Sequence, residues 1–161
     1  MQKYRPCAGA VVFNKKGQVL LGARNDTTGD NWQFPQGGIE NNETPAQAAM
    51  RELFEEMSVS SVELVHIEDE PIYYDFPNNI KENFRKRGIF FEGQAIYFGL
   101  FFFNGHDEEI SIETAVPEFK KCEWKSIDFA VSHIVEFKKD VYSHLAKKFT
   151  PLIKQYLENL S

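Results

Sequence analysis

The sequence is poor in cysteine and contains no long apolar run. Its 161 residues include two cysteines, Cys7 and Cys122, too few and wrongly spaced for a disulfide or zinc framework. The longest apolar runs, 8–13 and 96–103, are far shorter than the ~20 residues that cross a bilayer. No long apolar stretch follows the N-terminus either. We therefore expect a reduced, cytoplasmic protein with no membrane partner.

An excess of positive charge is also missing. The chain has 18 basic and 24 acidic residues and a net charge of −6, which argues against non-specific binding to nucleic acid. We expect no DNA partner, and no obligate protein partner is evident. A local basic patch of Lys81, Arg85, Lys86 and Arg87 could still hold a polyanionic ligand, although such runs are as often plain solvated surface.

The composition is that of a globular protein, with 42% apolar, 14% aromatic and 26% charged residues. Without repeats, low-complexity stretches or linkers, the chain is expected to form a single domain over residues 1–161. Strands and helices mix without strict alternation, which predicts an α/β fold with a mixed sheet between helices. The expected elements are a hairpin (8–13, 18–23), a loop (25–31), a helix (45–57), strands near 62–74, 94–104 and 119–126, a helix from Phe137 and a final helix restarting at Thr150-Pro151.

The helix 45–57 has clear start signals. Thr44 is the expected N-cap, Pro45 occupies the first helical position and Gln47 completes a capping box. Apolar residues recur at spacings of three and four and predict a buried stripe. That stripe consists of Ala46, Ala49, Met50, Leu53 and Met57.

Three glutamates lie in the C-terminal half of this helix. Glu52, Glu55 and Glu56 stand at i, i+3 and i+4, so we expect them to project from one side, opposite the apolar stripe. Arg51 can reach Glu55, which leaves the other two without a counter-charge near the C-terminal end of the helix dipole. A divalent cation such as Mg²⁺ or Mn²⁺ would relieve the repulsion. The alternative is a solvated, glutamate-rich face.

Two glycines precede the helix. Gly37-Gly38 lies between a short apolar segment and the capped helix. We expect a tight turn there, because glycine lets backbone groups approach other atoms closely. Such a turn would bring the backbone toward the carboxylates.

Together these residues resemble the Nudix box, G-x5-E-x7-R-E-U-x-E-E-x-G-U, in which U is aliphatic. The match covers residues 37–59: Gly37, Glu43 and Arg51-Glu52-Leu53-Phe54-Glu55-Glu56-Met57-Ser58-Val59. The only departure is Ser58, which stands where the family has the glycine that ends the helix. The resemblance implies a Nudix-type α/β/α sandwich and metal-dependent hydrolysis of a pyrophosphate bond in a nucleoside polyphosphate.

The resemblance also implies roles for the box residues. Glu52 and Glu56 would be the primary ligands of Mg²⁺ or Mn²⁺, with two or three ions present when substrate is bound, and the carbonyl of Gly37 would add an oxygen. Glu55 would be a further ligand or the catalytic base, and the sequence leaves both roles open. Arg51 would orient a box glutamate.

Similarity to one branch of this family extends over nearly the whole chain. That branch contains bacterial RNA pyrophosphohydrolases and asymmetric dinucleoside tetraphosphate hydrolases. The matching segments are Tyr4-Arg5-Pro6, Trp32-Gln33-Phe34-Pro35-Gln36-Gly37-Gly38, Pro117-Glu118-Phe119 and Phe137-Lys138-Lys139-Asp140-Val141-Tyr142. By this resemblance Glu118 would be a distal metal ligand or base, and Lys138 would meet a phosphate. Arg5 and Phe137 would sandwich a nucleobase, although core packing is an equally good interpretation of Phe137.

One departure concerns the substrate. The branch usually carries Gly-Gln-x-Gln-Lys-Trp, and residues 93–98 keep its first glutamine as Gln94 but replace its lysine with Tyr97. A residue of the basic run 81–87 could supply the missing charge. Tyr74, in a Tyr-Asp-Phe-Pro segment that resembles the tetraphosphate hydrolases, is a further candidate for substrate binding.

The preferred interpretation is a Nudix pyrophosphohydrolase that converts RNA 5′-triphosphate ends to 5′-monophosphate. The first rival has the same chemistry on a (di)nucleoside tetraphosphate, releasing ATP and AMP. A second rival, an inactive Nudix fold that binds nucleotide or RNA, is disfavoured by the intact glutamates. General cleaning of the nucleotide pool would favour modified triphosphates instead. The four histidines form no ligand-like pair and are given no catalytic role.

Overall fold

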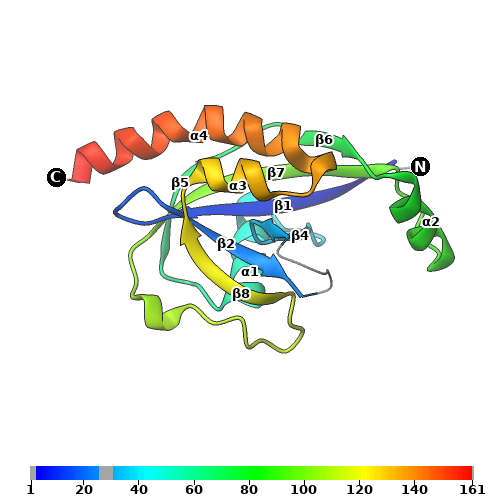
Figure 1. Ribbon diagram of the computed structural model, residues 1–161, viewed down its shortest axis with the longest axis horizontal. Helices are drawn as coiled ribbons and strands as arrows, with labels where there is room; N and C mark the ends of the chain where they lie inside the picture. The colour runs from blue at the N-terminus through cyan, green and yellow to red at the C-terminus, as the bar shows by residue number, and fades with distance from the viewer. Residues whose placement is uncertain (1–2, 26–30, 161) are drawn as a thin grey trace.

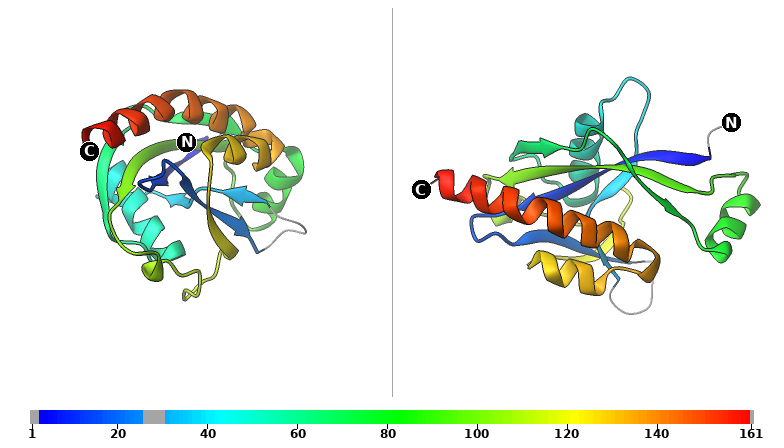
Figure 2. Two further views of the ribbon diagram at one scale, coloured as in Figure 1. Left: turned by 60° about the vertical axis from the view of Figure 1, so that its left-hand side comes forward. Right: turned by 90° about the horizontal axis from the view of Figure 1, so that it is seen from above.

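The computed structural model describes residues 3–25 and 31–160, and shows a mixed sheet between helices (Figures 1 and 2). Residues 26–30 of the expected loop therefore lie outside the described residues. The strands are β1 (Tyr4–Phe13), β2 (Val19–Arg24), β3 (Trp32–Gln33), β4 (Gln36–Gly38), β5 (Val62–Ile67), β6 (Ile72–Asp75), β7 (Gly93–Phe103) and β8 (Phe119–Lys125). The helices are α1 (Pro45–Met57), α2 (Asn78–Lys86), α3 (Ile127–His133) and α4 (Lys139–Leu160), with 3₁₀ turns at Asp107–Glu109 and Glu136–Lys138.

The sheet has both parallel and antiparallel pairs, as the sequence predicts. Its order is β3-β2-β1-β7-β5, with β4 paired to β1, β6 to β7 and β8 to β2. The long central strands β1 and β7 run parallel, from the pair Tyr4–Gly93 to the pair Phe13–Phe102. The other pairings are antiparallel.

Helices cover both faces of the sheet, which confirms the α/β/α sandwich. In Figure 1, α3 and α4 lie over one face and α1 lies beneath the other. The alternation of side chains along β1 supplies both cores. Cys7, Val11 and Phe13 belong to the apolar cluster that contains α3 and α4 residues. The intervening Ala8 and Val12 belong to the cluster under α1.

The expected hairpin between β1 and β2 is shorter than predicted. Asn14 shapes its turn, since its side-chain oxygen accepts hydrogen bonds from the backbone N–H of Lys16 and of Gln18, each at 3.0 Å. The two strands pair only at Phe13 and Val19. They then diverge, because β1 pairs with β4 and β2 pairs with β8.

The single strand expected near 62–74 is wrong, because the chain forms two strands there, β5 and β6. Residues 68–71 separate the two strands. Pro71 has no backbone N–H to donate to a neighbouring strand, and the buried side chain of Glu68 lies 2.6 Å from Nζ of Lys148. Both strands pair with β7, at different points along it.

The final helix does not restart at Thr150-Pro151. Instead α4 continues through Pro151, which is exposed, so water can satisfy the carbonyl that its ring leaves unbonded. The buried residues Leu145, Phe149 and Ile153 keep one apolar stripe on both sides of the proline, so packing on the sheet outweighs the local break. Even with this long helix, the described chain contains no helix long and apolar enough to cross a membrane.

Candidate active site

Helix α1 begins and ends as its sequence predicts. The side chain of Thr44 accepts from the Gln47 N–H and the side chain of Gln47 accepts from the Thr44 N–H, completing the capping box. Ser58 ends the helix in the left-handed conformation, with φ 61°. The predicted stripe needs a correction, because Met50 is 42% exposed and Ala46 is half-buried. The buried positions are Ala48, Ala49, Leu53, Glu56 and Met57.

The buried side of the helix therefore differs from the predicted one, and it includes one of the three glutamates. Glu56 is only 5% exposed, so the expectation of three carboxylates opposite the apolar stripe is wrong for this residue. Burial, and then the nearby charges of Glu52 and Glu118, raise the pKa of Glu56 to about 9, although the backbone N–H of Gln36 donates to it. Its Oε2 atom is buried and finds no hydrogen-bond partner among the described residues. An orphaned carboxylate oxygen of this kind needs a cation or a proton.

Arg51 organises the other carboxylates. It donates to Glu43 at 2.7 and 2.9 Å, to Glu52 at 2.8 Å and to Glu55 at 3.2 Å, and also to the carbonyl of Gly38 at 2.8 Å. Glu52 therefore has a counter-charge, contrary to the sequence-based expectation. Its pKa is still raised, because burial outweighs the effect of Arg51. The hydrogen bonds from Arg51, above all to Glu43, raise the pKa of the guanidinium itself.

The two glycines lie in a strand rather than in a tight turn. Gly37 and Gly38 belong to β4, which pairs with β1. The expected close approach is nevertheless present, since a Cβ on Gly37 would lie 2.2 Å from Cδ of Glu52. A Cβ on Gly38 would lie 2.7 Å from Nη2 of Arg5. A Cβ at either position would therefore displace the end of a side chain, the Glu52 carboxylate or the Arg5 guanidinium.

Nearly all the residues singled out in the sequence line one cleft of about 1320 Å³. The exceptions are Arg51, which contacts the carboxylates through the hydrogen bonds described above, its partner Glu43, and Lys81, Arg85 and Lys86 of the basic run. The predicted residues that line the cleft are Arg5, Gly37, Glu52, Glu55, Glu56, Tyr74, Gln94, Glu118, Phe137 and Lys138. Segments far apart in the sequence thus converge on one site.

Another part of the cleft lining is aromatic and basic. Tyr74 donates a hydrogen bond to Gln94, and its ring lies 5.9 Å from that of Phe137, centre to centre. Nζ of Lys138 lies 5.6 Å from the centre of the Tyr74 ring. Burial, and then the charge of Arg24, lower the pKa of Lys138 to about 8. Phe137 packs against the core, which confirms that interpretation, and it also lines the cleft, where contact with a nucleobase stays a prediction.

Among the cleft residues that sequence reasoning missed are Arg24 and Gln36. Arg24 ends β2, one position beyond the expected strand, and its charge acts on both Glu56 and Lys138. A basic residue at the end of an apolar strand was the available signal. Gln36 lies within the quoted Trp32–Gly38 segment, but its backbone contact with Glu56 depends on how β4 lies against α1.

The carboxylates do not form a ready-made metal cage. Across residues 3–25 and 31–160, no three Asp, Glu, His or Cys side chains are grouped to hold an ion. Glu52 and Glu55 instead turn toward Arg51. The orphaned oxygen of Glu56 and the clearance at Gly37 still suit a hard cation, because Mg²⁺ takes few protein carboxylates and completes its shell with waters and phosphates.

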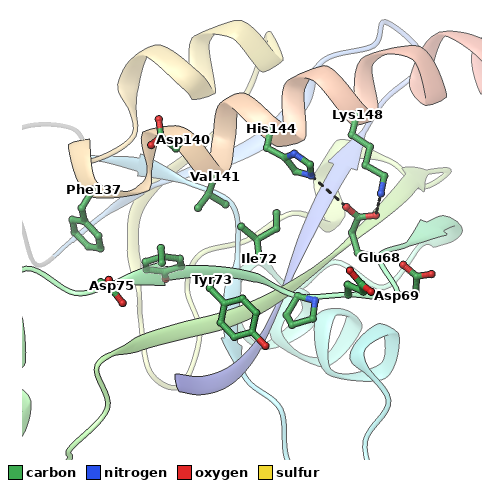
Figure 3. Close-up of a pocket in the computed structure, with 13 residues that line it drawn as sticks. Glu68, Asp69, Ile72, Tyr73, Asp75, Phe137, Asp140, Val141, His144 and Lys148 are labelled. Carbon is green, nitrogen blue, oxygen red and sulfur yellow. Dashed lines mark ion pairs between the residues drawn. The ribbon is translucent and has the colours of Figure 1, made fainter. Parts of the chain in front are cut away.

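A second groove of about 710 Å³ lies between β6 and α4 and shares Tyr74 and Phe137 with the cleft. We call it the α4 groove. Figure 3 shows Lys148 and His144 of α4 pointing toward Glu68, at 2.6 and 3.9 Å. His66 lies 2.9 Å from the same carboxylate. Two of the four histidines therefore face a buried carboxylate outside the cleft.

Comparison with known proteins agrees with this geometry. The model of the NUDIX domain matches residues 3–145, and the chain belongs to the Nudix family. It is 38% identical over 157 residues to the RNA pyrophosphohydrolase of Wolbachia pipientis subsp. Culex pipiens, covering 95% of this chain and 93% of the relative. It is 39% identical over 141 residues to the RNA pyrophosphohydrolase of Roseobacter denitrificans, covering 86% and 87%.

Solved structures share the fold at lower identity. A Caenorhabditis elegans Ap4A hydrolase in a binary complex superimposes with a TM-score of 0.65 at 17% identity, covering 91% of this chain and 98% of that one. The Escherichia coli dihydroneopterin triphosphate pyrophosphohydrolase gives 0.63 at 19%, covering 98% and 99%. Hydrolases of this family generally use divalent metal ions.

Proposed function

We propose that this chain is a divalent-metal-dependent pyrophosphohydrolase that converts RNA 5′-triphosphate ends to 5′-monophosphate. The observation that carries the proposal is the arrangement of charge in the cleft. The same cleft holds the glutamates of α1, with the orphaned Glu56 oxygen among them, and the basic side chains of buried Lys138 and of Arg24. A site that binds a polyphosphate needs basic side chains, which pair with the phosphate oxygens, and carboxylates, which hold the bridging metal ions. The names of the curated relatives support RNA as the substrate.

The metal ligands we propose are Glu52 and Glu56, with the Gly37 carbonyl, and Glu55 and Glu118 at the rim of the same cleft. Two or three Mg²⁺ or Mn²⁺ ions, bound together with substrate, would neutralise phosphate charge and lower the pKa of a bound water. Arg51 holds Glu52 and Glu55 in place, and Glu43 holds Arg51.

The remaining residues bind and orient the substrate. Lys138 contacts a phosphate oxygen. Its buried ammonium forms no ion pair with another described residue, so it is available for this contact. Arg5 lies against Gly38 at the mouth of the cleft and stacks on the first base together with Phe137. Tyr74 and Gln94, joined by their hydrogen bond, form the wall behind that base.

The reaction adds water across a P–O–P bond. The oxygen of water bonds to one phosphorus, and the bridging oxygen leaves on the other phosphorus. The water proton passes to Glu55 or Glu118, the carboxylates at the rim, and the RNA keeps a 5′-monophosphate. Both are suitable as bases because neither is fully buried, so the proton can reach solvent.

A second candidate is hydrolysis of a dinucleoside tetraphosphate to ATP and AMP. The paired rings of Tyr74 and Phe137 favour it, because they offer an aromatic surface to a nucleobase. The likeness to an Ap4A hydrolase concerns the fold alone.

We also place the protein in the cytoplasm, since Cys7 and Cys122 are both free thiols.

The decisive experiment offers equimolar 5′-triphosphorylated RNA and diadenosine tetraphosphate to the protein in one tube with Mg²⁺, and separates the products. Preferential formation of RNA 5′-monophosphate supports the proposal, whereas release of ATP and AMP supports the second candidate. Binding of either substrate without products would make the chain a binding module. The Glu56→Gln variant should lose most activity, and Glu123→Gln, at an exposed position of β8, is its matched control.

A further inference from the structure

Helix α2 stands apart from the helices that cover the sheet (Figures 1 and 2). It contains no fully buried residue in its described span. Phe84 anchors it, since its ring lies 5.0 Å from that of the buried Phe76, centre to centre. Ile80, Asn83, Phe84 and Arg87 of this segment line the cleft. One side of α2 therefore faces whatever the cleft holds.

The basic residues of this segment differ in what they contact. Lys81 lies 2.8 Å from Glu92, and Arg85 lies 3.8 Å from the same carboxylate, so Glu92 partly neutralises both. The guanidinium of Arg87 lies 5.2 Å from the centre of the Phe84 ring and lines the cleft. Stacking on a ring leaves the edge of a guanidinium open for hydrogen bonds to an anion.

The neighbouring α4 groove carries the opposite charge. It shares Tyr74 and Phe137 with the cleft, and Figure 3 shows Asp69, Asp75 and Asp140 among the side chains that line it. Lys148, which also lines this groove, already forms an ion pair with the buried carboxylate of Glu68. A nucleic acid chain that left the cleft through this groove would place its phosphates beside aspartates, whereas α2 offers Arg87.

We propose that Arg87, stacked on Phe84, forms a subsite for the phosphodiester that follows the first nucleotide of the RNA, so that the chain leaves the cleft over α2. This inference rests on the proposed function and deepens it. A guanidinium binds a phosphate through two parallel hydrogen bonds, and the Phe84 ring beside it offers a surface on which the second base stacks. A nucleoside triphosphate has no phosphodiester and cannot use the subsite.

The test compares chain lengths. 5′-Triphosphorylated substrates of one, two and eight nucleotides are given to the wild type, to Arg87→Gln and to Lys86→Gln. The last variant removes the same charge from the adjacent, exposed residue. In the wild type, kcat/KM should rise from one nucleotide to two and then change little. Arg87→Gln should lower the ratio of kcat/KM for two nucleotides to that for one by about tenfold, the size expected for a lost phosphate contact. Lys86→Gln should keep the ratio of the wild type.

Three results would overturn the subsite. An unchanged ratio in Arg87→Gln would show that Arg87 does not distinguish a chain from a mononucleotide. Equal falls in Arg87→Gln and Lys86→Gln would indicate diffuse attraction to α2. A ratio near one in the wild type would mean that the second nucleotide is not bound at all. A failure of the proposed function looks different, because the wild type would then convert no triphosphorylated RNA of any length.

Discussion

Arg51 and Glu43 form a two-point contact on the side of α1 that carries Glu52 and Glu55. Nε of Arg51 donates to one carboxylate oxygen at 2.7 Å and Nη2 donates to the other at 2.9 Å. This fork fixes the plane of the guanidinium, so that its remaining nitrogen can reach both Glu52 and Glu55. Glu43 thereby positions two cleft carboxylates without lining the cleft.

Replacing Arg51 with lysine should therefore impair turnover. Lysine keeps the charge but cannot make the fork, so Glu52 loses its fixed orientation. We expect Arg51→Lys to lower kcat by about 10- to 100-fold, the usual cost of losing a residue that holds a metal ligand. Glu43→Gln should give part of the same loss and a raised requirement for Mg²⁺. Steady-state kinetics across a Mg²⁺ titration checks both, and wild-type kcat in both variants would contradict the role assigned to this pair.

The close approach of Gly37 to the Glu52 carboxylate can be tested by substitution. A Cβ at this position would collide with the carboxylate of Glu52, 2.2 Å away, so Gly37→Ala must displace a proposed metal ligand. We expect a loss of activity of about 100-fold or more with the fold retained. Gly88→Ala is the matched control, because φ of +77° strains an alanine there while nothing lies within 4 Å of its Cβ. That variant should lose about 1 kcal/mol of stability and keep its activity. Comparable activity losses in the two variants would refute the explanation.

Burial of Glu56 predicts how stability depends on pH when the metal is removed. The pKa of Glu56 rises from an ordinary 4.5 to about 9 on folding, so the folded state binds a proton that the unfolded state has released. The wild type should then lose stability as the pH rises from 4.5 toward 9. Glu56→Gln does not titrate and should be more stable than the wild type by about 3 kcal/mol at pH 7. The advantage should vanish below pH 4.5.

Thermal and urea unfolding in EDTA at several pH values measures this difference. Added Mg²⁺ should stabilise the wild type more than Glu56→Gln, because only the wild type gains a charged ligand for it. Glu123→Gln, at an exposed position, should follow the wild type at every pH. Parallel pH profiles for the wild type and Glu56→Gln would show that the buried carboxyl is not protonated in the metal-free protein.

Local signals in the sequence predicted the parts of the fold that depend on near neighbours. The capping box at Thr44, the end of α1 at Met57 and the strand that became β7 follow from residues a few positions apart. Two of the failures involve distant contacts. Packing of Phe149 and Ile153 on the sheet carries α4 through Pro151, and the contact of Glu68 with Lys148 lies at the break that separates β5 from β6.

The candidate site shows the same division. A motif of fixed spacing was enough to name the carboxylates, and ten predicted residues indeed line one cleft. Their individual environments were not predictable. The sequence placed Glu56 on an exposed face, although burial under β4 decides its pKa, and it left Glu52 without the partner that Arg51 provides. Those properties depend on how β4 lies across α1, which no local pattern encodes.

Ser58 allows a test of the one departure from the box. Its φ of 61° is strained for serine, but its hydroxyl donates to the carbonyl of Ser111 at 3.2 Å and so ties α1 to the segment that leads to Glu118. Ser58→Gly should relieve about 1 kcal/mol of strain and lose a bond of about the same value, leaving stability nearly unchanged. Ser58→Ala keeps the strain without the bond and should lose about 1 kcal/mol. Urea unfolding of the three proteins decides, and a large gain in Ser58→Gly would show that the hydroxyl contributes nothing.

Lys138 predicts how substrate binding depends on pH. Burial and the charge of Arg24 lower its pKa from an ordinary 10.5 to about 8, so its ammonium is half deprotonated at that pH in the free enzyme. Because only the charged form attracts a phosphate, kcat/KM should fall above pH 8, by about tenfold at pH 9. Lys138→Arg stays charged throughout and should keep a flat profile from pH 7.5 to 9.5. Lys138→Met should be low at every pH, also without a bend near pH 8. If Lys138→Arg bends where the wild type does, another group controls the alkaline limb and Lys138 does not contact the phosphate.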